Sequence, residues 1–385
     1  MITLIIFILV LGLLVLVHEL GHFLAARRFG VKVEEFGFGF PPRLAGVYRR
    51  ADGKWRWIRG EKTVRENPST IYSFNLIPLG GFVKIKGENG QDGDRDSFGA
   101  KKFWQRAVML SAGVMMNIVL AAVIISIGLG VGLPQILDGV NPKAKVGWRQ
   151  IQVVEVLPTS PAAAADVKIG DVIVNIDGRE FKTFKEIQDF VGARQGRELT
   201  YSLKRGPETL DKKITPTLIK DTGRGGIGIG IAEVGLVRYP WYLAIAEGVK
   251  TTGAMLWLII SGLFGLLKQL LSGQNVSGEV AGPVGIATLT GQMVRLGWVY
   301  VAQFTAVLSL NLAVVNILPI PALDGGRLLF LAIAKLRRKP LRPEIEGLIH
   351  NIFFVLLLLL ILFITVKDIS KLGCLTCQLR QFFNL

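Results

Sequence analysis

The chain has 385 residues, of which 50% are hydrophobic and 19% are charged, and its formal net charge is +16. The apolar content excludes an intrinsically disordered chain, and the charged fraction is below the value of about 25% that is usual in soluble globular proteins. A basic excess of this size indicates nucleic-acid binding in a soluble protein, but in a membrane protein it reflects Lys and Arg in cytoplasmic loops.

The first apolar segment runs from Ile2 to Ala26, and residues 2–17 carry no charge. As a helix this segment would be about 37 Å long, enough to cross a hydrocarbon core of about 30 Å. A cleaved signal peptide is the alternative, but no basic region precedes the apolar run and charged side chains follow it instead. We therefore expect a transmembrane helix that is retained.

Three later segments are also long and apolar enough to span a membrane, at residues 107–133, 299–323 and 349–366. Residues 253–271 form a further candidate, with Lys268 near one end. These segments predict a polytopic α-helical membrane protein. We expect residues 1–133 to form the first half of its membrane-embedded core.

Basic residues in the loops predict the orientation. Residues 27–106 contain seventeen Lys and Arg against nine Asp and Glu, and residues 327–342 contain six basic residues. The positive-inside rule places both loops in the cytoplasm. Four crossings fit this arrangement only if residues 253–271 do not cross. We therefore expect an extracytoplasmic region at 240–298 whose amphipathic helix lies on the membrane.

Residues 148–233 differ in character, with strand-like alternation and an Asp-Gly turn that predict an antiparallel, barrel-like β domain. Three stretches of this insert resemble a bacterial PDZ domain, at residues 160–163, 170–173 and 176–178. A generic small β domain is the alternative. PDZ domains bind extended peptides or C-termini by adding a strand to a sheet edge, and residues 226–231 are the candidate edge.

The first apolar segment contains His18 and His22, which a helix places on one face. Two imidazoles and a carboxylate suit a tetrahedral zinc ion with one open position, and H-E-x-x-H is the pattern of zinc metalloproteases. Glu19 lies beside both histidines and would take the proton of a zinc-activated water. The alternative is a histidine pair satisfied by helix packing. We disfavour it because ionisable residues inside an apolar helix are costly.

A third ligand is needed, and Asp324 is the better of two candidates. It lies at the inner end of the segment 299–323, which the predicted topology places level with the inner end of the first helix. By itself Asp324 could be a turn residue before a pair of glycines. His350 begins the last apolar segment, and we expect it to be an interfacial residue.

Several motifs together resemble the site-2 protease family, in particular its bacterial RseP-like (regulator of sigma-E protease) branch. The resemblance covers nearly the whole chain, although only one PDZ domain is present where the best-known proteobacterial members have two. It rests on the following residues: His18-Glu19-x-x-His22, Gly113-x-x-x-Asn117, Asn316-x-x-Pro319 and Leu323-Asp324-Gly325, with the PDZ insert.

This resemblance implies an intramembrane protease with Zn²⁺ bound by His18, His22 and Asp324 and with Glu19 as the general base. Its substrates would be single-span membrane proteins such as anti-sigma factors or signal-peptide remnants. The chain would lie in the bacterial cytoplasmic (inner) membrane, with the PDZ domain outside and the second half of the protease core at residues 299–385. We expect no nucleic-acid partner.

The resemblance also points to a membrane-reentrant β-loop at residues 73–84. A transmembrane substrate must unwind before cleavage, and its freed amides then need partners, which a strand edge supplies. Asn316 would hold the substrate backbone or polarise its carbonyl. A short cytoplasmic hairpin and interhelical packing of Asn316 are the alternatives. The expected substrate-binding residues are Gly80, Gly81, Phe82, Asn316 and Pro319.

The alternative function is a membrane-embedded PDZ scaffold with a structural or vestigial metal site. Glu19 discriminates between the two functions, because a structural zinc has no use for an adjacent carboxylate. A transporter is disfavoured because no inverted repeat of broken helices is evident. Cys374 and Cys377 could form a disulfide or remain two thiols.

Overall fold

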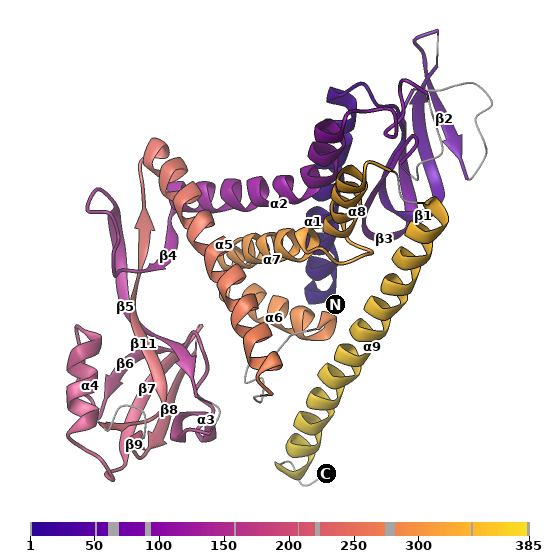
Figure 1. Cartoon of the computed structure of the whole chain (residues 1–385). Coiled ribbons are helices and arrows are strands. Elements are labelled where there is room, and N and C mark those ends of the chain that lie inside the picture. Colours follow the sequence, from indigo (N-terminus) through magenta and orange to yellow (C-terminus); the bar gives the residue numbers. More distant parts are fainter. Residues whose placement is uncertain are drawn as a thin grey trace. The chain divides into compact units, whose positions relative to one another are not determined.

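The structure is a computed structural model, and it describes residues 2–50, 52–60, 69–88, 94–157, 159–206, 208–219, 224–273, 282–339 and 342–382. The side chains of Cys374 and Cys377 lie outside this description. The chain divides into two compact units (Figure 1). The helical unit comprises Met1–Ile125 and Val249–Leu385, and the β-rich unit comprises Ser126–Gly248.

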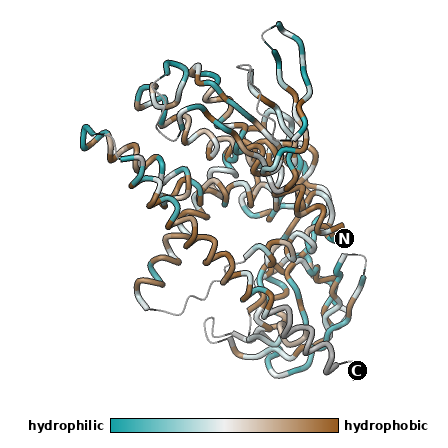
Figure 2. The backbone as a smooth tube through the Cα atoms, turned by 90° about the vertical axis from the view of Figure 1, so that its right-hand side faces the viewer, coloured by the Kyte–Doolittle hydropathy of each residue, from teal (hydrophilic) through white to brown (hydrophobic). Residues whose placement is uncertain are grey.

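Long apolar helices dominate the helical unit, and the tube in Figure 2 is brown along much of their length. Within the described residues, five helices are long and apolar enough to cross a membrane: α1, α2, α5, α7 and residues 344–370 of α9. The helix bounds are α1 (Ile2–Arg28), α2 (Phe103–Val131), α5 (Trp241–Leu271), α6 (Pro283–Leu296), α7 (Trp298–Ile317), α8 (Asp324–Arg337) and α9 (Pro343–Phe382). The segment expected at 253–271 is thus the second part of a longer helix, α5, which itself meets the length and apolarity of a span.

Helices α1 and α7 run in the same direction. Val10, in the first half of α1, packs with Val301 near the start of α7. Two turns further along α1, the ring of His18 lies beside the side chain of Asn316, near the end of α7. Both helices therefore run from the same end of the helical unit toward its opposite end.

Helices α2 and α9 run the opposite way. The carbonyl of Met109 near the start of α2 contacts His22, whereas Asn117 further along α2 contacts His18, which comes earlier in α1. In α9, Asp368 accepts a hydrogen bond from a backbone amide of α6, and α6 lies against the first turn of α1. Alternating directions of this kind are what successive membrane crossings produce.

A small sheet is formed by the part of the chain between α1 and α2. It consists of β1 (Val33–Arg49), β2 (Trp55–Arg59) and β3 (Ile71–Ile85), in the order β2-β1-β3. Strands β1 and β3 form one long antiparallel ribbon that folds back on itself. As a result, residues 35–38 of β1 pair both with residues 81–84 and with residues 71–74 of β3.

The β-rich unit contains a six-stranded antiparallel sheet in the order β4-β11-β5-β6-β7-β8 and a separate β9–β10 pair. Its strands are β4 (Leu133–Ile136), β5 (Lys145–Val156), β6 (Val172–Ile176), β7 (Leu199–Arg205), β8 (Glu208–Ile214), β9 (Thr217–Ile219), β10 (Arg224–Gly226) and β11 (Ile229–Arg238). Its two short helices are α3 (Pro161–Ala164) and α4 (Phe184–Gly192), each begun by a side-chain cap, from Ser160 and Thr183. These hydroxyls satisfy amides that a helix start leaves without partners.

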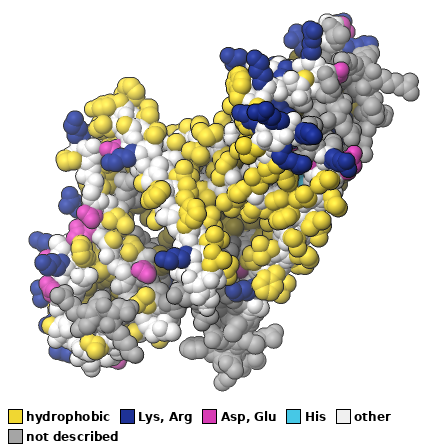
Figure 3. Space-filling view, in the orientation of Figure 1, with side chains coloured by type: hydrophobic (Ala, Val, Ile, Leu, Met, Phe, Trp, Pro, Cys, Tyr) yellow, Lys and Arg dark blue, Asp and Glu magenta, His cyan; other side chains and the backbone are white. Residues whose placement is uncertain are grey.

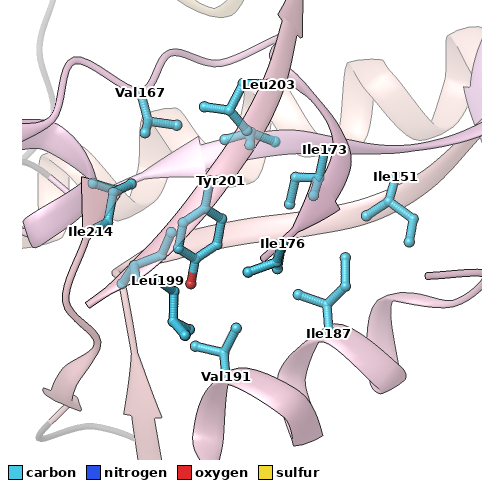
Figure 4. Close-up of a cluster of buried hydrophobic side chains, with 13 residues drawn as sticks. Ile151, Val167, Ile173, Ile176, Ile187, Val191, Leu199, Tyr201, Leu203 and Ile214 are labelled. Carbon is cyan, nitrogen blue, oxygen red and sulfur yellow. The ribbon is translucent and has the colours of Figure 1, made fainter. Parts of the chain in front are cut away.

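Aliphatic side chains from this sheet and from α4 form the core of the β-rich unit (Figure 4). Leu199, Tyr201 and Leu203 project from one face of β7, and Ile187 and Val191 face them from α4. Alternate residues of a strand share a face, so β7 presents all three to the helix. Full burial of each such side chain stabilises the fold by about 1.5–3 kcal/mol.

Candidate metal centre

Three potential metal ligands from α1 and α8 converge in the helical unit. The Nε2 atoms of His18 and His22 are 3.2 Å apart, and Oδ2 of Asp324 lies 2.9 Å from the first and 3.3 Å from the second. Two ligand atoms bound to zinc at about 2.1 Å with tetrahedral angles lie about 3.4 Å apart. The three atoms therefore already have nearly the mutual spacing of three corners of a zinc tetrahedron.

The outer nitrogens of the two imidazoles are held by α2. Nδ1 of His22 donates to the carbonyl of Met109 at 2.8 Å, which leaves the lone pair of Nε2 facing the other ligands. Nδ1 of His18 is 3.3 Å from the Asn117 amide nitrogen, while the buried Oδ1 of Asn117 has no partner among the described residues. Turning this amide by 180° lets Oδ1 accept from His18 Nδ1–H, and both imidazoles then present Nε2 to one point.

Glycines let the helices approach and leave room at the ligand atoms. A Cβ atom at Gly113 of α2 would overlap Nε2 of His22 and lie 2.7 Å from Nε2 of His18. A Cβ atom at Gly21 of α1 would overlap the carbonyl of Ala112 on α2. The space at Gly113, the donor spacing and the imidazole orientations together fit a zinc ion.

Asp324 reaches the centre because the chain reverses sharply between α7 and α8. A Cβ atom at Gly325 would overlap the carbonyl of Ile317, and one at Gly326 would overlap the carbonyl of Ile320. Only glycine avoids these overlaps, so the pair after Asp324 fixes the tight return of the chain.

His350 supports the same turn from α9. Its Nδ1 accepts a hydrogen bond of 3.1 Å from the backbone amide of Ala322, whose φ of +87° is rare for a residue with a side chain. Ala322 precedes Asp324 by two residues, and His350 itself is not among the three converging ligands. The sequence did not reveal this role, because no local pattern links residues 28 positions apart.

Glu19 is half-buried and follows His18 directly on α1. Its carboxylate interacts electrostatically with both imidazoles and with Asp324. Close to it, an ion pair joins Glu88, beyond the end of β3, to Arg327 of α8. This pair ties the helix that begins with Asp324 to the sheet, and sequence patterns gave no sign of it.

The five expected substrate-binding residues fall in three places. Nδ2 of Asn316 lies 3.5 Å from His18 Nε2, at the centre itself. Pro319 is exposed in the turn between α7 and α8. Gly80 and Gly81 lie on β3 against Val15 and Leu16 of α1, about one turn before His18, and Phe82 follows them on the same strand segment.

Comparisons with known proteins agree on one family. A model of Peptidase family M50 matches residues 6–58 and 62–360. The chain is 33% identical to the "Putative zinc metalloprotease Atu1380" of Agrobacterium fabrum, with 95% of each chain covered. It is 29% identical to "Regulator of sigma-W protease RasP" of Bacillus subtilis, over 96% of this chain and 99% of the relative. It is 30% identical to "Zinc metalloprotease RasP" of Geobacillus kaustophilus, over 95% and 97%.

A solved structure matches part of the chain. It is the PDZ domain of the SdrC-like protein Lmo2051 from Listeria monocytogenes, 32% identical, covering 23% of this chain and 92% of that domain, with a TM-score of 0.21. A TM-score this low does not establish a shared fold. The PDZ assignment of the β-rich unit therefore stays a prediction.

Proposed function

We propose roles, topology and substrates for a chain that belongs to the Peptidase M50 family, the site-2 proteases, and that is accordingly a zinc metalloprotease of the intramembrane type. We propose that His18, His22 and Asp324 bind the zinc ion and that Glu19 is the general base. The observation that carries this assignment is the convergence of the three ligand atoms at about tetrahedral spacing within a bundle of apolar helices.

In the proposed reaction, zinc bound there would act as a Lewis acid toward the scissile carbonyl and would acidify a water molecule. Glu19 accepts a proton from the attacking water and delivers it to the departing amide nitrogen. The water oxygen bonds to the carbonyl carbon as the C–N bond breaks. Asn316, beside His18, can donate from Nδ2 to the carbonyl oxygen as negative charge develops on it.

We propose that the edge of β3 at residues 80–85 holds the unwound substrate. Among the described strands, only β1 pairs with this segment, so its other edge offers backbone groups. Gly80 and Gly81 bring the segment close to α1 near the catalytic residues. An added substrate strand would satisfy the amides and carbonyls that unwinding exposes in an apolar site.

We propose that the chain crosses the inner membrane four times, through α1, α2, α7 and α9, with the protease core at residues 1–133 and 299–385. The shared direction of α1 and α7 supports this, because α7 can repeat the direction of α1 only after an odd number of crossings between them. Helix α2 supplies one such crossing, and α9 comes after α7 in the chain. α5 and α6, in the proposed extracytoplasmic region 240–298, then contribute either none or a pair.

Because α2 already supplies one crossing, α5 and α6 together can add only an even number. If α2 returns outward and α7 again runs inward, α5 crosses only if α6 crosses back. With 14 residues, α6 is about 21 Å long, too short for a hydrocarbon core of about 30 Å. We therefore propose that α5 lies on the outer surface. Labelling of single cysteines in intact cells tests this: positions 56 and 338 should be protected and position 182 accessible.

We propose that residues 148–233, within the β-rich unit, form an extracytoplasmic PDZ domain that binds a peptide or a C-terminus. Residues 229–233 of β11 pair with β5, and no described strand pairs with their other edge. Helix α4 lies near β10 and β11. A free strand edge beside a helix is the arrangement by which a sheet takes up an extended peptide.

The name of the Bacillus subtilis relative mentions regulation of sigma-W, which supports anti-sigma-factor-like single-span proteins as substrates here; signal-peptide remnants are the other candidates. The test is co-expression of the intact chain or Glu19→Gln with tagged single-span proteins. General-base catalysis contributes about 10²–10⁴-fold, so cleavage by Glu19→Gln should fall by at least about 100-fold while zinc content stays near that of the intact chain. Undiminished cleavage by this variant would rule out Glu19 as the general base.

A further inference from the structure

A second polar site lies away from the metal centre, where α1 ends and the small sheet begins. A cavity of about 470 Å³ opens there, lined among the described residues by Arg27, Val31, Lys32, Val33, Arg49, Trp55, Ser69, Thr70 and Tyr72. Three of these side chains are basic, three carry hydroxyls, two are aromatic and none is acidic. We propose that this pocket binds the phosphate group of an anionic phospholipid headgroup.

The basic side chains are held in place around the cavity. Arg27 lies in the last turn of α1, with its guanidinium 5.4 Å from the ring centre of Phe23. Arg49 is anchored through Nε, which donates to the carbonyl of Gly53 at 3.0 Å, so its remaining guanidinium nitrogens are positioned by this bond. A guanidinium fixed in this way loses little freedom when it binds a phosphate oxygen.

Hydroxyl and aromatic groups complete the wall. Ser69 is fastened to β1 at Arg49, from whose backbone amide it accepts and to whose carbonyl it donates. The rings of Trp55 and Tyr72 are 6.3 Å apart, and Trp55 is 61% exposed, so an apolar surface continues from the cavity to the outside. A phosphate with a glycerol group attached would meet cations and hydroxyls at one side and aromatic carbon at the other.

The end of a helix normally repels an anion, because its last carbonyls carry partial negative charge. In α1 these carbonyls are occupied: the amides of residues 29, 30 and 31 donate to the carbonyls of Ala25, Arg27 and Ala26. The negative end of the helix is thereby capped by the chain itself. The cations of the pocket then determine the local potential.

The position of the pocket selects a lipid as the source of the phosphate. Arg27 belongs to a helix that is long and apolar enough to span, so the pocket lies at the level where such a helix leaves the hydrocarbon. Figure 3 shows Lys and Arg gathered over the part of the helical unit that contains β1, β2 and α8, beside the apolar surface. Trp57, two residues after Trp55 on the same face of β2, is 81% exposed, and interfacial tryptophans commonly lie at headgroup depth.

The test uses the purified full chain in nanodiscs of phosphatidylcholine with and without phosphatidylglycerol, with lipid retention measured by native mass spectrometry. Each basic residue near a membrane surface contributes enough for about a fivefold change in affinity, so the double variant Arg27→Gln/Arg49→Gln should bind phosphatidylglycerol about 30-fold more weakly. Arg28→Gln is the matched control, because Arg28 lies in the same helical turn but does not line the cavity. It should retain the lipid.

Two results would overturn the proposal. If Arg28→Gln weakens lipid retention as much as Arg27→Gln, the effect is diffuse surface charge and the pocket is not a site. If inorganic phosphate binds as tightly as phosphatidylglycerol, the ligand is a free phosphate and the lipid assignment is wrong. Arg49→Lys, which keeps the charge, should retain most of the binding and guards against a double variant that fails to fold.

Discussion

The metal centre and the core of the β-rich unit both contain buried side chains, two histidines in the first and mostly aliphatic residues in the second, but their parts come together differently. At the metal centre, His18 and Asp324 meet across 306 positions of sequence, and the atoms that touch are polar. In the β-rich unit, Leu199, Tyr201 and Leu203 lie on one strand and meet aliphatic groups of a nearby helix. The first region depends on a few atoms at fixed separations, and the second on filling a volume.

The difference determines what each region tolerates. Removal of a methyl group from an aliphatic core lowers stability in proportion to the cavity left, and neighbours relax into part of the space. Addition of one methyl group at Gly113 would place a carbon atom where the ligand nitrogens converge. The ligands could accommodate this atom only by moving apart. Substitutions at the metal centre should therefore act on zinc binding, and substitutions in the aliphatic core on stability.

The largest effect is expected from Asp324→Ala. Loss of one of three ligands should remove the zinc ion and all measurable cleavage, because two histidines alone hold zinc weakly. Metal analysis of the purified chain checks this. Asp368→Ala, at the far end of α9, is the control and should keep both zinc and activity. Full zinc occupancy in Asp324→Ala would rule out this residue as the third ligand.

Gly113→Ala should weaken zinc binding by about 10-fold to 100-fold, since forcing an extra methyl group into a filled space costs about 1–3 kcal/mol. Gly130→Ala on the same helix is the matched control, because its added Cβ would have an ordinary contact of 3.8 Å. Zinc titration with a competing chelator measures both. Equal affinities of the two variants would show that the space at Gly113 is not needed.

His350→Ala should lower activity by about tenfold, because the turn that carries Asp324 loses its support from α9, and outer partners of ligands contribute about 10-fold to 100-fold. Asn351→Ala, its exposed neighbour, is the control. Competition with a chelator distinguishes a positioning role from a general loss of stability: His350→Ala should release zinc faster at a temperature at which its helical content is unchanged. An unchanged release rate would contradict the role.

Leu199→Ala should have the smallest effect on the metal centre. The substitution should destabilise the β-rich unit by about 2–5 kcal/mol, because Leu199 is fully buried there. Thermal unfolding followed by limited proteolysis within residues 126–248 measures the loss. Zinc content should not change. A parallel loss of zinc would mean that the two regions are not independent in stability.

Local spacing explains which parts of the centre were accessible from sequence. His18 and His22 are four residues apart on a helix, so their shared face follows from helical geometry alone. Asp324 required a further step, the depth of two segments in a membrane, and the structure places it beside both histidines. Gly113 and Asn117 entered only through a family resemblance, because a glycine and an asparagine in an apolar helix have no chemistry that marks them.

The contacts that sequence could not supply are those between distant elements. A hairpin was the simple alternative for the β-loop, and nothing in its pattern indicates that the ribbon of β1 and β3 folds back to pair twice. The ion pair of Glu88 with Arg327 joins residues 239 positions apart. In the β-rich unit local periodicity is sufficient for single elements: the apolar residues of α4 recur at helical spacing, and those of β7 alternate as in a strand.

The doubled pairing of β1 and β3 has a mechanical consequence. Because residues 71–75 lie in the middle of the sheet and residues 80–85 at its edge on one continuous strand, a pull on the edge is resisted by the hydrogen bonds of the whole ribbon. Fraying of such an edge is coupled to opening of the sheet, whereas a simple hairpin end frays by itself. An unwound substrate strand that adds to this edge, as proposed above, therefore pairs with a strand that keeps its conformation. The change in conformation occurs in the substrate.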